Sequence, residues 1–301
     1  MLNKVINKLS GLGSKKKLFI SADRKLEPTL SPHIVCAAIA SSILDRKPFL
    51  ACRFGWFETF AIGHYDLNGS ITDAIMHKMW NTPGIFPPTE SAFVDFYSEY
   101  TKAMASADIL GLMHCPHEAS VVTRHAPQAY LCMLQDLEPY YNPIPWSKYL
   151  AGLTVLVVNP FVDSIESQYS QFREKLFFEP DILPQFKLIK IKPPQTLCGN
   201  TSGFESWNAA LLDLKTKISD LKFDVAIIGC GAYGLPISSF IKESGIPCIQ
   251  LGGATQTLFG VFGERWIKNN PVKYYINKYW KRPDESERPN NWQDAERGCY
   301  W

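Results

Sequence analysis

A glycine-rich turn in the second half of the chain has the spacing of a phosphate-binding motif. It reads Gly229-Cys230-Gly231-Ala232-Tyr233-Gly234 and lies between a strand predicted at 225–228 and a helix predicted at 235–243. Glycines let the backbone approach a phosphate closely, and free N–H groups at the start of a helix favour an anion. We expect Gly229, Gly231, Tyr233 and Gly234 to contact a nucleotide or sugar phosphate. The alternative is that these glycines only permit a tight turn.

An NAD site would need more than this turn. A Rossmann dinucleotide site has an acidic residue about 20 residues after the glycines, at the end of the next strand. That strand is predicted at 247–251 and is followed by Gly252 and Gly253, with no carboxylate. We therefore expect no NAD.

A second glycine-rich turn, Gly252-Gly253-Ala254-Thr255-Gln256-Thr257, also follows a predicted strand. Ligands of open parallel sheets bind beyond the carboxyl ends of the strands, so both turns are expected to line one crevice. In this turn, Gly252 and Gly253 supply backbone freedom, while Thr255 and Gln256 are predicted to hydrogen-bond a sugar or a base.

Two charged side chains flank a third turn, Arg53-Phe54-Gly55-Trp56-Phe57-Glu58, after an apolar strand predicted at 49–54. An Arg and a Glu so close to an apolar run form either a structural ion pair or an active-site pair. In the second case Glu58 would act as a general base or support a cation, and Arg53 would face a phosphate bidentately. Gly55, between them, is expected to contact the bound nucleotide.

A cluster of polar residues, His114-Cys115-Pro116-His117-Glu118, follows a strand predicted at 109–113. The His-x-x-His spacing is poor for one helix face and no second ligand pair matches it, which disfavours zinc. We expect a loop that lines the crevice, with His114, His117 and the more distant Arg265 as contacts to phosphate or acceptor; Arg124 and His125 would join this loop.

Strands and helices alternate along the chain, which predicts an α/β fold with a Rossmann-like, doubly wound, mostly parallel sheet. The run Thr154–Val158 is apolar throughout, as in a strand buried on both faces, whereas 186–192 alternates and is expected nearer an edge. Further strands and helices are predicted at 49–54, 109–113, 225–228, 247–251, and at 33–45, 90–107, 162–177, 204–221 and 235–243.

Composition narrows the class of protein. The 301 residues are 46% hydrophobic and carry a net charge of +2, which excludes overall disorder and gives no general attraction to nucleic acid. The eight cysteines form no C-x-x-C pair and are expected as buried thiols in a reducing compartment. No G-x-S-x-G, Walker A or H-E-x-x-H motif occurs. With no apolar run of membrane-spanning length and no signal peptide, we expect a cytoplasmic protein.

Three segments are predicted. Residues 1–27 are basic, with Lys15, Lys16 and Lys17, and are either a solvated terminus or a weak peripheral contact to the inner face of an anionic membrane. Residues 28–281 form the α/β domain. Residues 282–301 are polar but end in two aromatic residues, Tyr300 and Trp301, so we expect this tail to fold back onto the body.

Several of these segments resemble bacterial proteins with a GT-D-like glycosyltransferase domain, over most of residues 30–301. The similarity is carried by Arg53-Phe54-Gly55 with Glu58, 157–161, 224–236, 251–256, 258–260, Arg265-Trp266 and the closing 298–301. The resemblance implies a nucleotide-sugar donor and a glycan or lipid-linked acceptor, in the synthesis of bacterial surface polysaccharide.

The resemblance also implies a position for a divalent metal ion. In GT-D enzymes an Asp-x-Glu motif holds a divalent cation that bridges the donor diphosphate. Here Trp56 stands at the Asp position, so Glu58 is the one candidate ligand for Mn²⁺ or Mg²⁺ in the motif. One carboxylate needs substrate phosphates and other oxygens to complete a site. Without a metal, helix starts at Gly231 and Ala254 together with Arg53 or Arg265 would neutralise the leaving diphosphate.

Two other classes of function stay open. The loss of the Asp at Trp56 favours a non-catalytic module that binds a nucleotide or sugar. An NAD-linked oxidoreductase is the third reading, and bound cofactor absorbance in the purified protein would reveal it.

Overall fold

The protein is described by a computed structural model, which covers residues 25–268 and 271–301. Its centre is a sheet of seven strands in the order β3-β2-β1-β7-β6-β4-β5, and all the pairings are parallel. The predicted α/β class with a doubly wound sheet is therefore confirmed. The strands are β1 (Phe49–Arg53), β2 (Ile109–Leu112), β3 (Tyr130–Met133), β4 (Thr154–Val158), β5 (Lys187–Ile191), β6 (Val225–Ile228) and β7 (Pro247–Gln250).

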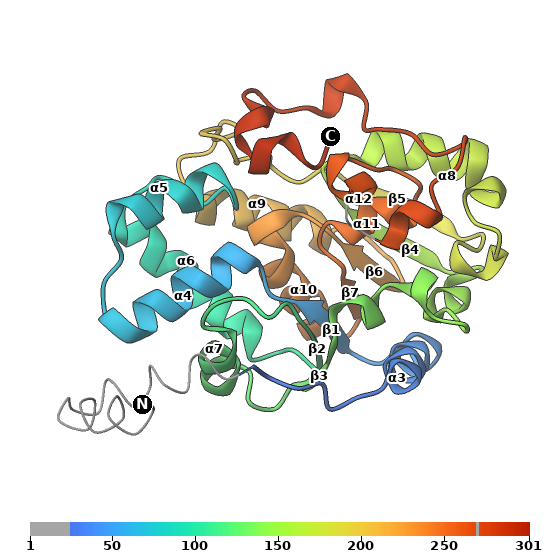
Figure 1. Cartoon of the computed structure of the whole chain (residues 1–301), viewed down its shortest axis with the longest axis horizontal. Helices are drawn as coiled ribbons and strands as arrows, with labels where there is room; N and C mark the ends of the chain where they lie inside the picture. The colour runs from blue at the N-terminus through green and yellow to red at the C-terminus, as the bar shows by residue number, and fades with distance from the viewer. Residues whose placement is uncertain (1–24, 269–270) are drawn as a thin grey trace, which may run out of the picture.

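Helices cover both faces of the sheet (Figure 1). One face packs against α4 (Trp56–Asn68), α5 (Asp73–Asn81), α6 (Glu90–Met104), α7 (Glu118–His125), α9 (Trp207–Ser219) and α10 (Gly234–Glu243). The other face packs against α3 (Pro32–Leu44), α8 (Val162–Leu176), α11 (Ala254–Leu258) and α12 (Glu264–Lys268). Alternate residues of β4 enter the two cores, which explains its unbroken apolar run.

The chain reverses its winding where β1 and β7 meet. Ala51 of β1 lies opposite Ile249 of β7, although the two are distant in the sequence. After β1 the chain passes to α4 on one face, and after β7 it passes to α11 on the other. Such a reversal opens a crevice beyond the carboxyl ends of the strands.

The expected edge position of the fifth strand is confirmed, because β5 ends the order and pairs with β4 alone among the described strands. Sequence reasoning missed β3, α4, α5, α7 and α12, and α7 stands where Arg124 and His125 were expected to join a loop. Strand β3 has only four residues. Helix α4 has 13 residues, but it begins with Trp56 directly after the Gly55 turn, where no Ser, Thr, Asp or Asn marks the N-cap.

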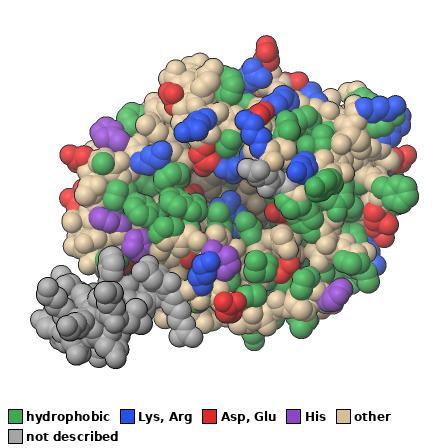
Figure 2. Space-filling view, in the orientation of Figure 1, with side chains coloured by type: hydrophobic (Ala, Val, Ile, Leu, Met, Phe, Trp, Pro, Cys, Tyr) green, Lys and Arg blue, Asp and Glu red, His purple; other side chains and the backbone are tan. Residues whose placement is uncertain are grey.

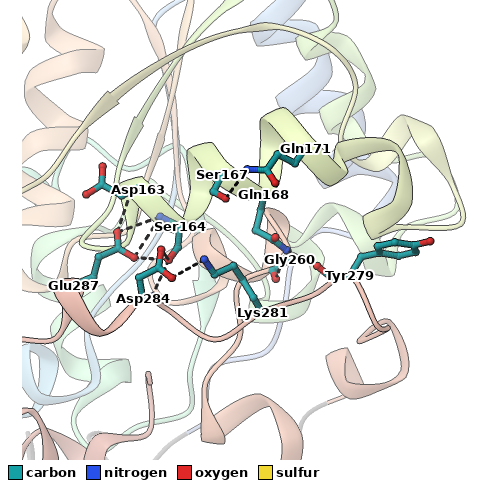
Figure 3. A network of polar contacts seen from close by, with 10 residues as sticks. All are labelled: Asp163, Ser164, Ser167, Gln168, Gln171, Gly260, Tyr279, Lys281, Asp284 and Glu287. Atoms are coloured by element: carbon teal, nitrogen blue, oxygen red, sulfur yellow. Dashed lines mark hydrogen bonds and ion pairs between the residues drawn. The ribbon is translucent and has the colours of Figure 1, made fainter.

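Residues 282–301 lie against the body around the start of α8. In Figure 3 the Glu287 carboxylate faces Ser164, and it accepts hydrogen bonds from the amides of Asp163 at 2.9 Å and Ser164 at 3.3 Å. Those amides have no hydrogen-bond acceptor inside the helix. The buried Glu287 carboxylate accepts from both of them, and its negative charge lies at the positive end of the helix dipole. Asp284 accepts from the Ser164 hydroxyl at 3.2 Å and pairs with Lys281 at 2.6 Å. The start of α8 is thereby filled by the chain itself.

We expect Glu287→Gln to lower the free energy of unfolding by about 2 kcal/mol, because a buried charge-assisted cap becomes a neutral one. Urea unfolding followed by circular dichroism measures this. Glu285→Gln is the matched control, since its side chain is 90% exposed and should change stability by less than about 0.5 kcal/mol. Equal stability of the two variants would contradict the capping role.

The cysteines of the described residues are all free thiols, and Cys299 is the one that is partly exposed. The basic segment with Lys15, Lys16 and Lys17 lies outside the described residues, so its membrane contact stays a prediction. Across 25–268 and 271–301, every helix is too short or too polar to cross a membrane.

Candidate functional site

A cavity of about 190 Å³ opens at the carboxyl ends of the strands. One buried water takes up roughly 10–15 Å³ of such a volume, so the cavity takes a ligand of a dozen or more non-hydrogen atoms. Figure 2 shows the molecule hollowed near the middle of the face drawn there. Most of the wall comes from segments after six of the strands and from the tail: 53–58, 113, 159–161, 193–197, 229–233, 250–256 and 295–301. Thr82, Pro83, Tyr100 and Arg265 complete it.

The two glycine-rich turns touch each other at this cavity. A Cβ atom on Gly229 would lie 2.3 Å from the carbonyl oxygen of Gly252 and 2.5 Å from the Thr255 hydroxyl oxygen. Gly231 and Gly252 adopt φ values of 58° and 60°, the left-handed region that favours glycine. The structure thus brings the predicted turns together, and Gly229, Gly231, Tyr233, Gly252, Gly253 and Gln256 line the cavity.

Two residues of the glycine-rich turns that were predicted to contact the ligand do not line the cavity. Thr255 is fully buried, and its hydroxyl donates to the Ile228 carbonyl at 3.1 Å, which ties one turn to the other. Gly234 begins α10 and lies against the Gln250 side chain. Both therefore shape the turns rather than face the opening.

Tyr233 and Gln256 line the cavity but already have partners. The Tyr233 ring stacks on Trp207 with centroids 5.5 Å apart, and its hydroxyl lies 2.8 Å from that of Thr196. The Gln256 amide donates to the Tyr300 carbonyl at 3.2 Å. Tyr233 acts as a wall, and Gln256 joins the second turn to the tail.

Arg53 presents a guanidinium to the cavity without a carboxylate partner. Its Nε and Nη2 atoms donate to the Phe54 carbonyl at 3.1 and 3.0 Å. Within the described part of the chain it forms no ion pair, so the alternative of a structural pair between Arg53 and Glu58 is not what the structure shows. A partly buried, unpaired guanidinium on a cavity wall suits an anionic ligand.

Glu58 lies in the first turn of α4 with 7% of its surface exposed. Its carboxylate rests against Gly55, where a Cβ atom would lie only 1.9 Å from one carboxylate oxygen. Burial raises the pKa of Glu58, and its own amide and the Arg53 charge oppose that rise. The Tyr100 hydroxyl accepts a hydrogen bond from the Gly55 amide at 3.1 Å and holds the turn in place.

The donor set does not fit a divalent metal. Trp56, at the position where the resemblance predicts a second ligand, is an aromatic side chain with 40% of its surface exposed. The other carboxylate on the cavity, Glu296, forms an ion pair with Arg265. Nowhere in 25–268 or 271–301 do three His, Cys, Asp or Glu side chains gather closely enough to hold a metal ion.

Residues 114–118, the loop that was expected to line the crevice, directly follow Met113, which lines the cavity, but are not themselves among the lining residues. The Glu118 carboxylate accepts from the amides of Met113 and His114, each at 2.8 Å, and so fixes the loop. The His117 ring packs on Phe60 with centroids 5.7 Å apart. Their predicted contacts to phosphate or acceptor stay predictions.

Arg124 and His125 also lie away from the opening. Both pair with Asp66, the guanidinium at 3.3 Å and the imidazole at 2.8 Å. They join α7 to α4.

The tail residues on the cavity were missed by sequence reasoning. The Trp301 ring is 4% exposed and meets Phe161 edge-on at 5.7 Å. Arg265 donates to the Tyr300 hydroxyl at 3.0 Å and lies over its ring at 4.4 Å. The one signal in the sequence was the pair of terminal aromatics, which indicated burial but not where.

Comparison of the chain with protein-family models, with curated proteins and with solved structures finds no match.

Proposed function

We propose that this chain is a glycosyltransferase that moves a sugar from a nucleotide-sugar donor to a glycan or lipid-linked acceptor in bacterial surface polysaccharide synthesis. The observation that carries the proposal is one cavity that combines two touching glycine turns, an unpaired guanidinium and a buried carboxylate. Sugar transfer needs these parts, because a diphosphate must leave and an acceptor hydroxyl must lose a proton.

Each group has one role in the reaction. The Glu58 carboxylate takes the proton of the acceptor hydroxyl as that oxygen bonds to the anomeric carbon. The bond between the anomeric carbon and the diphosphate oxygen breaks, and the electron pair leaves with the diphosphate. Arg53 then faces the developing negative charge, where a fixed cation in a partly buried site stabilises it more than in water.

A metal ion is not part of this proposal. The described side chains supply one unpaired carboxylate at the site, and Mg²⁺ or Mn²⁺ normally needs more oxygen ligands. The guanidinium of Arg53 takes the role of the counter-charge instead. A carboxylate-poor cavity also favours a second candidate, a module that binds the nucleotide sugar without turnover.

The test is a panel of nucleotide sugars, read first by thermal shift and then by release of nucleoside diphosphate. We expect at least one donor to raise the melting temperature and to be hydrolysed or transferred, with the same rate in EDTA as in Mn²⁺. Stabilisation without release at any pH would support the binding module. Release that EDTA abolishes would refute the metal-independent mechanism, and no response to any donor would refute both.

A further inference from the structure

The second cation of the cavity, Arg265, is occupied by the chain itself. Its guanidinium forms an ion pair with the Glu296 carboxylate, and both residues line the cavity. The Tyr300 ring covers the same guanidinium at 4.4 Å. The charged side chains that line the cavity are two arginines and two glutamates: Arg53, Glu58, Arg265 and Glu296. Of these, Arg265 and Glu296 neutralise each other in an ion pair.

The segment that carries Glu296 is held in a costly conformation. Glu296 and Arg297 have φ values of 48° and 60°, a region that non-glycine residues adopt rarely and at an energetic cost. The backbone around them is fastened independently of the ion pair: the Arg265 amide donates to the Cys299 carbonyl at 2.9 Å, and Arg282 donates to the Trp301 carbonyl at 2.7 Å. The Glu296 side chain can leave Arg265 while the tail stays attached.

We propose that Arg265 is the second anion-binding residue of this cavity and that Glu296 is its resident counter-ion, which a phosphate group of the ligand replaces. An anion stabilises the partly buried Arg265 guanidinium, and the Glu296 carboxylate is that anion when no ligand is bound. A phosphate offers the same bidentate geometry with more charge. The inference rests on the proposed function for its ligand class, a diphosphate.

The exchange has a consequence for selectivity. A neutral sugar has no anionic group that can replace the Glu296 carboxylate on Arg265, so it leaves the ion pair between them intact. A diphosphate ends the pairing and gains two guanidinium partners, Arg53 and Arg265. Glu296 thus acts as a positioning residue that favours charged donors over free sugars.

Isothermal titration with inorganic pyrophosphate tests this on the full chain. We expect Glu296→Gln to bind pyrophosphate about tenfold more tightly than the parent protein, and Arg265→Gln to bind it more weakly by a similar factor. In the double variant the gain from Glu296→Gln should disappear. Glu264→Gln is the matched control: it removes an exposed carboxylate next to Arg265 in sequence, paired with Arg282 and Lys268, and should change affinity less than twofold.

Melting temperatures of all variants show whether each one folds, and Glu296→Asp, which keeps the charge but shortens its reach, replaces Glu296→Gln if that variant does not. Unchanged pyrophosphate affinity in the Glu296 variant, or a gain that persists without Arg265, would overturn the inference. The inference would also be overturned if neither the parent protein nor any of the variants bound pyrophosphate. Because this assay needs no sugar transfer, tighter binding without any donor turnover would leave the ion exchange standing and refute the transferase.

Discussion

Glu58→Gln is expected to lower the rate of sugar transfer by about 10²–10⁴-fold while the affinity for the donor stays within a few-fold. Loss of a positioned general base has this range of effects, and glutamine keeps the shape of the side chain. Release of nucleoside diphosphate measures the rate, and calorimetry measures donor affinity. Glu90→Gln is the matched control, because Glu90 also lies in the first turn of a helix but is exposed. Full transfer activity in Glu58→Gln would remove Glu58 from the mechanism.

The same residue predicts the pH dependence of the rate. Burial raises the pKa of Glu58 above the ordinary value of 4.5, and only the ionised carboxylate can accept a proton. The rate should therefore fall as the pH drops, with a midpoint above 4.5 rather than at it. A pH profile with no acid limb above that value would contradict the role of base.

The free energy of unfolding should have the opposite pH dependence to the rate. The folded protein holds the Glu58 proton more tightly than the unfolded chain, so the parent protein loses stability as the pH rises from about 4.5 through the raised pKa. Glu58→Gln has no such proton, so its melting temperature should exceed that of the parent at neutral pH. The difference should vanish near pH 4, where both side chains are neutral. A functional residue that costs stability behaves in this way.

Gly229→Ala is the second substitution with a large expected effect. The added methyl group would lie 2.3 Å from the Gly252 carbonyl oxygen and 2.5 Å from the Thr255 hydroxyl oxygen, and the nearer atom belongs to the backbone. The two glycine turns must move apart, which we expect to cost roughly 3 kcal/mol of stability and to abolish binding of pyrophosphate. Urea unfolding and calorimetry measure the two losses.

Gly234→Ala is its matched control in the same turn. A Cβ atom there meets the terminal amide nitrogen of the Gln250 side chain at 3.0 Å rather than backbone, and position 234 begins α10, where alanine is a better helix former. Its stability should stay within about 1 kcal/mol of the parent. If both alanine variants behaved alike, contact between the turns would not be what holds the cavity together.

Local pattern was sufficient for six of the seven strands, all except β3, and for the two glycine-rich turns that line the site. Thr154–Val158 and Val225–Ile228 are buried strands where unbroken apolar runs predicted them, and the glycine turns follow strands as expected. Spacing alone placed the turns after neighbouring strands, and parallel topology then brought them together. The physics involved is local, because glycine conformation and strand burial depend on nearby residues.

The rest of the site depends on long-range contacts that no local pattern encodes. Thr255 was expected to face the ligand, but the close approach of Gly229 turns its hydroxyl to the Ile228 carbonyl. Glu296 gave no signal in the sequence, because its role depends on where the tail crosses the cavity. The sequence could not show that Arg53 lacks an ion-pair partner either, because Glu58 lies only five residues away and an ion pair between the two was an open alternative.

The place of β7 in the sheet also governs how the molecule is made. Strands β1 to β3 and strands β4 to β6 form two blocks that β7 joins, since it pairs with β1 on one side and β6 on the other. Until residues 247–250 leave the ribosome, the two blocks present open edges, which are templates for unwanted association. Chains interrupted before β7 should therefore aggregate rather than accumulate as half-molecules.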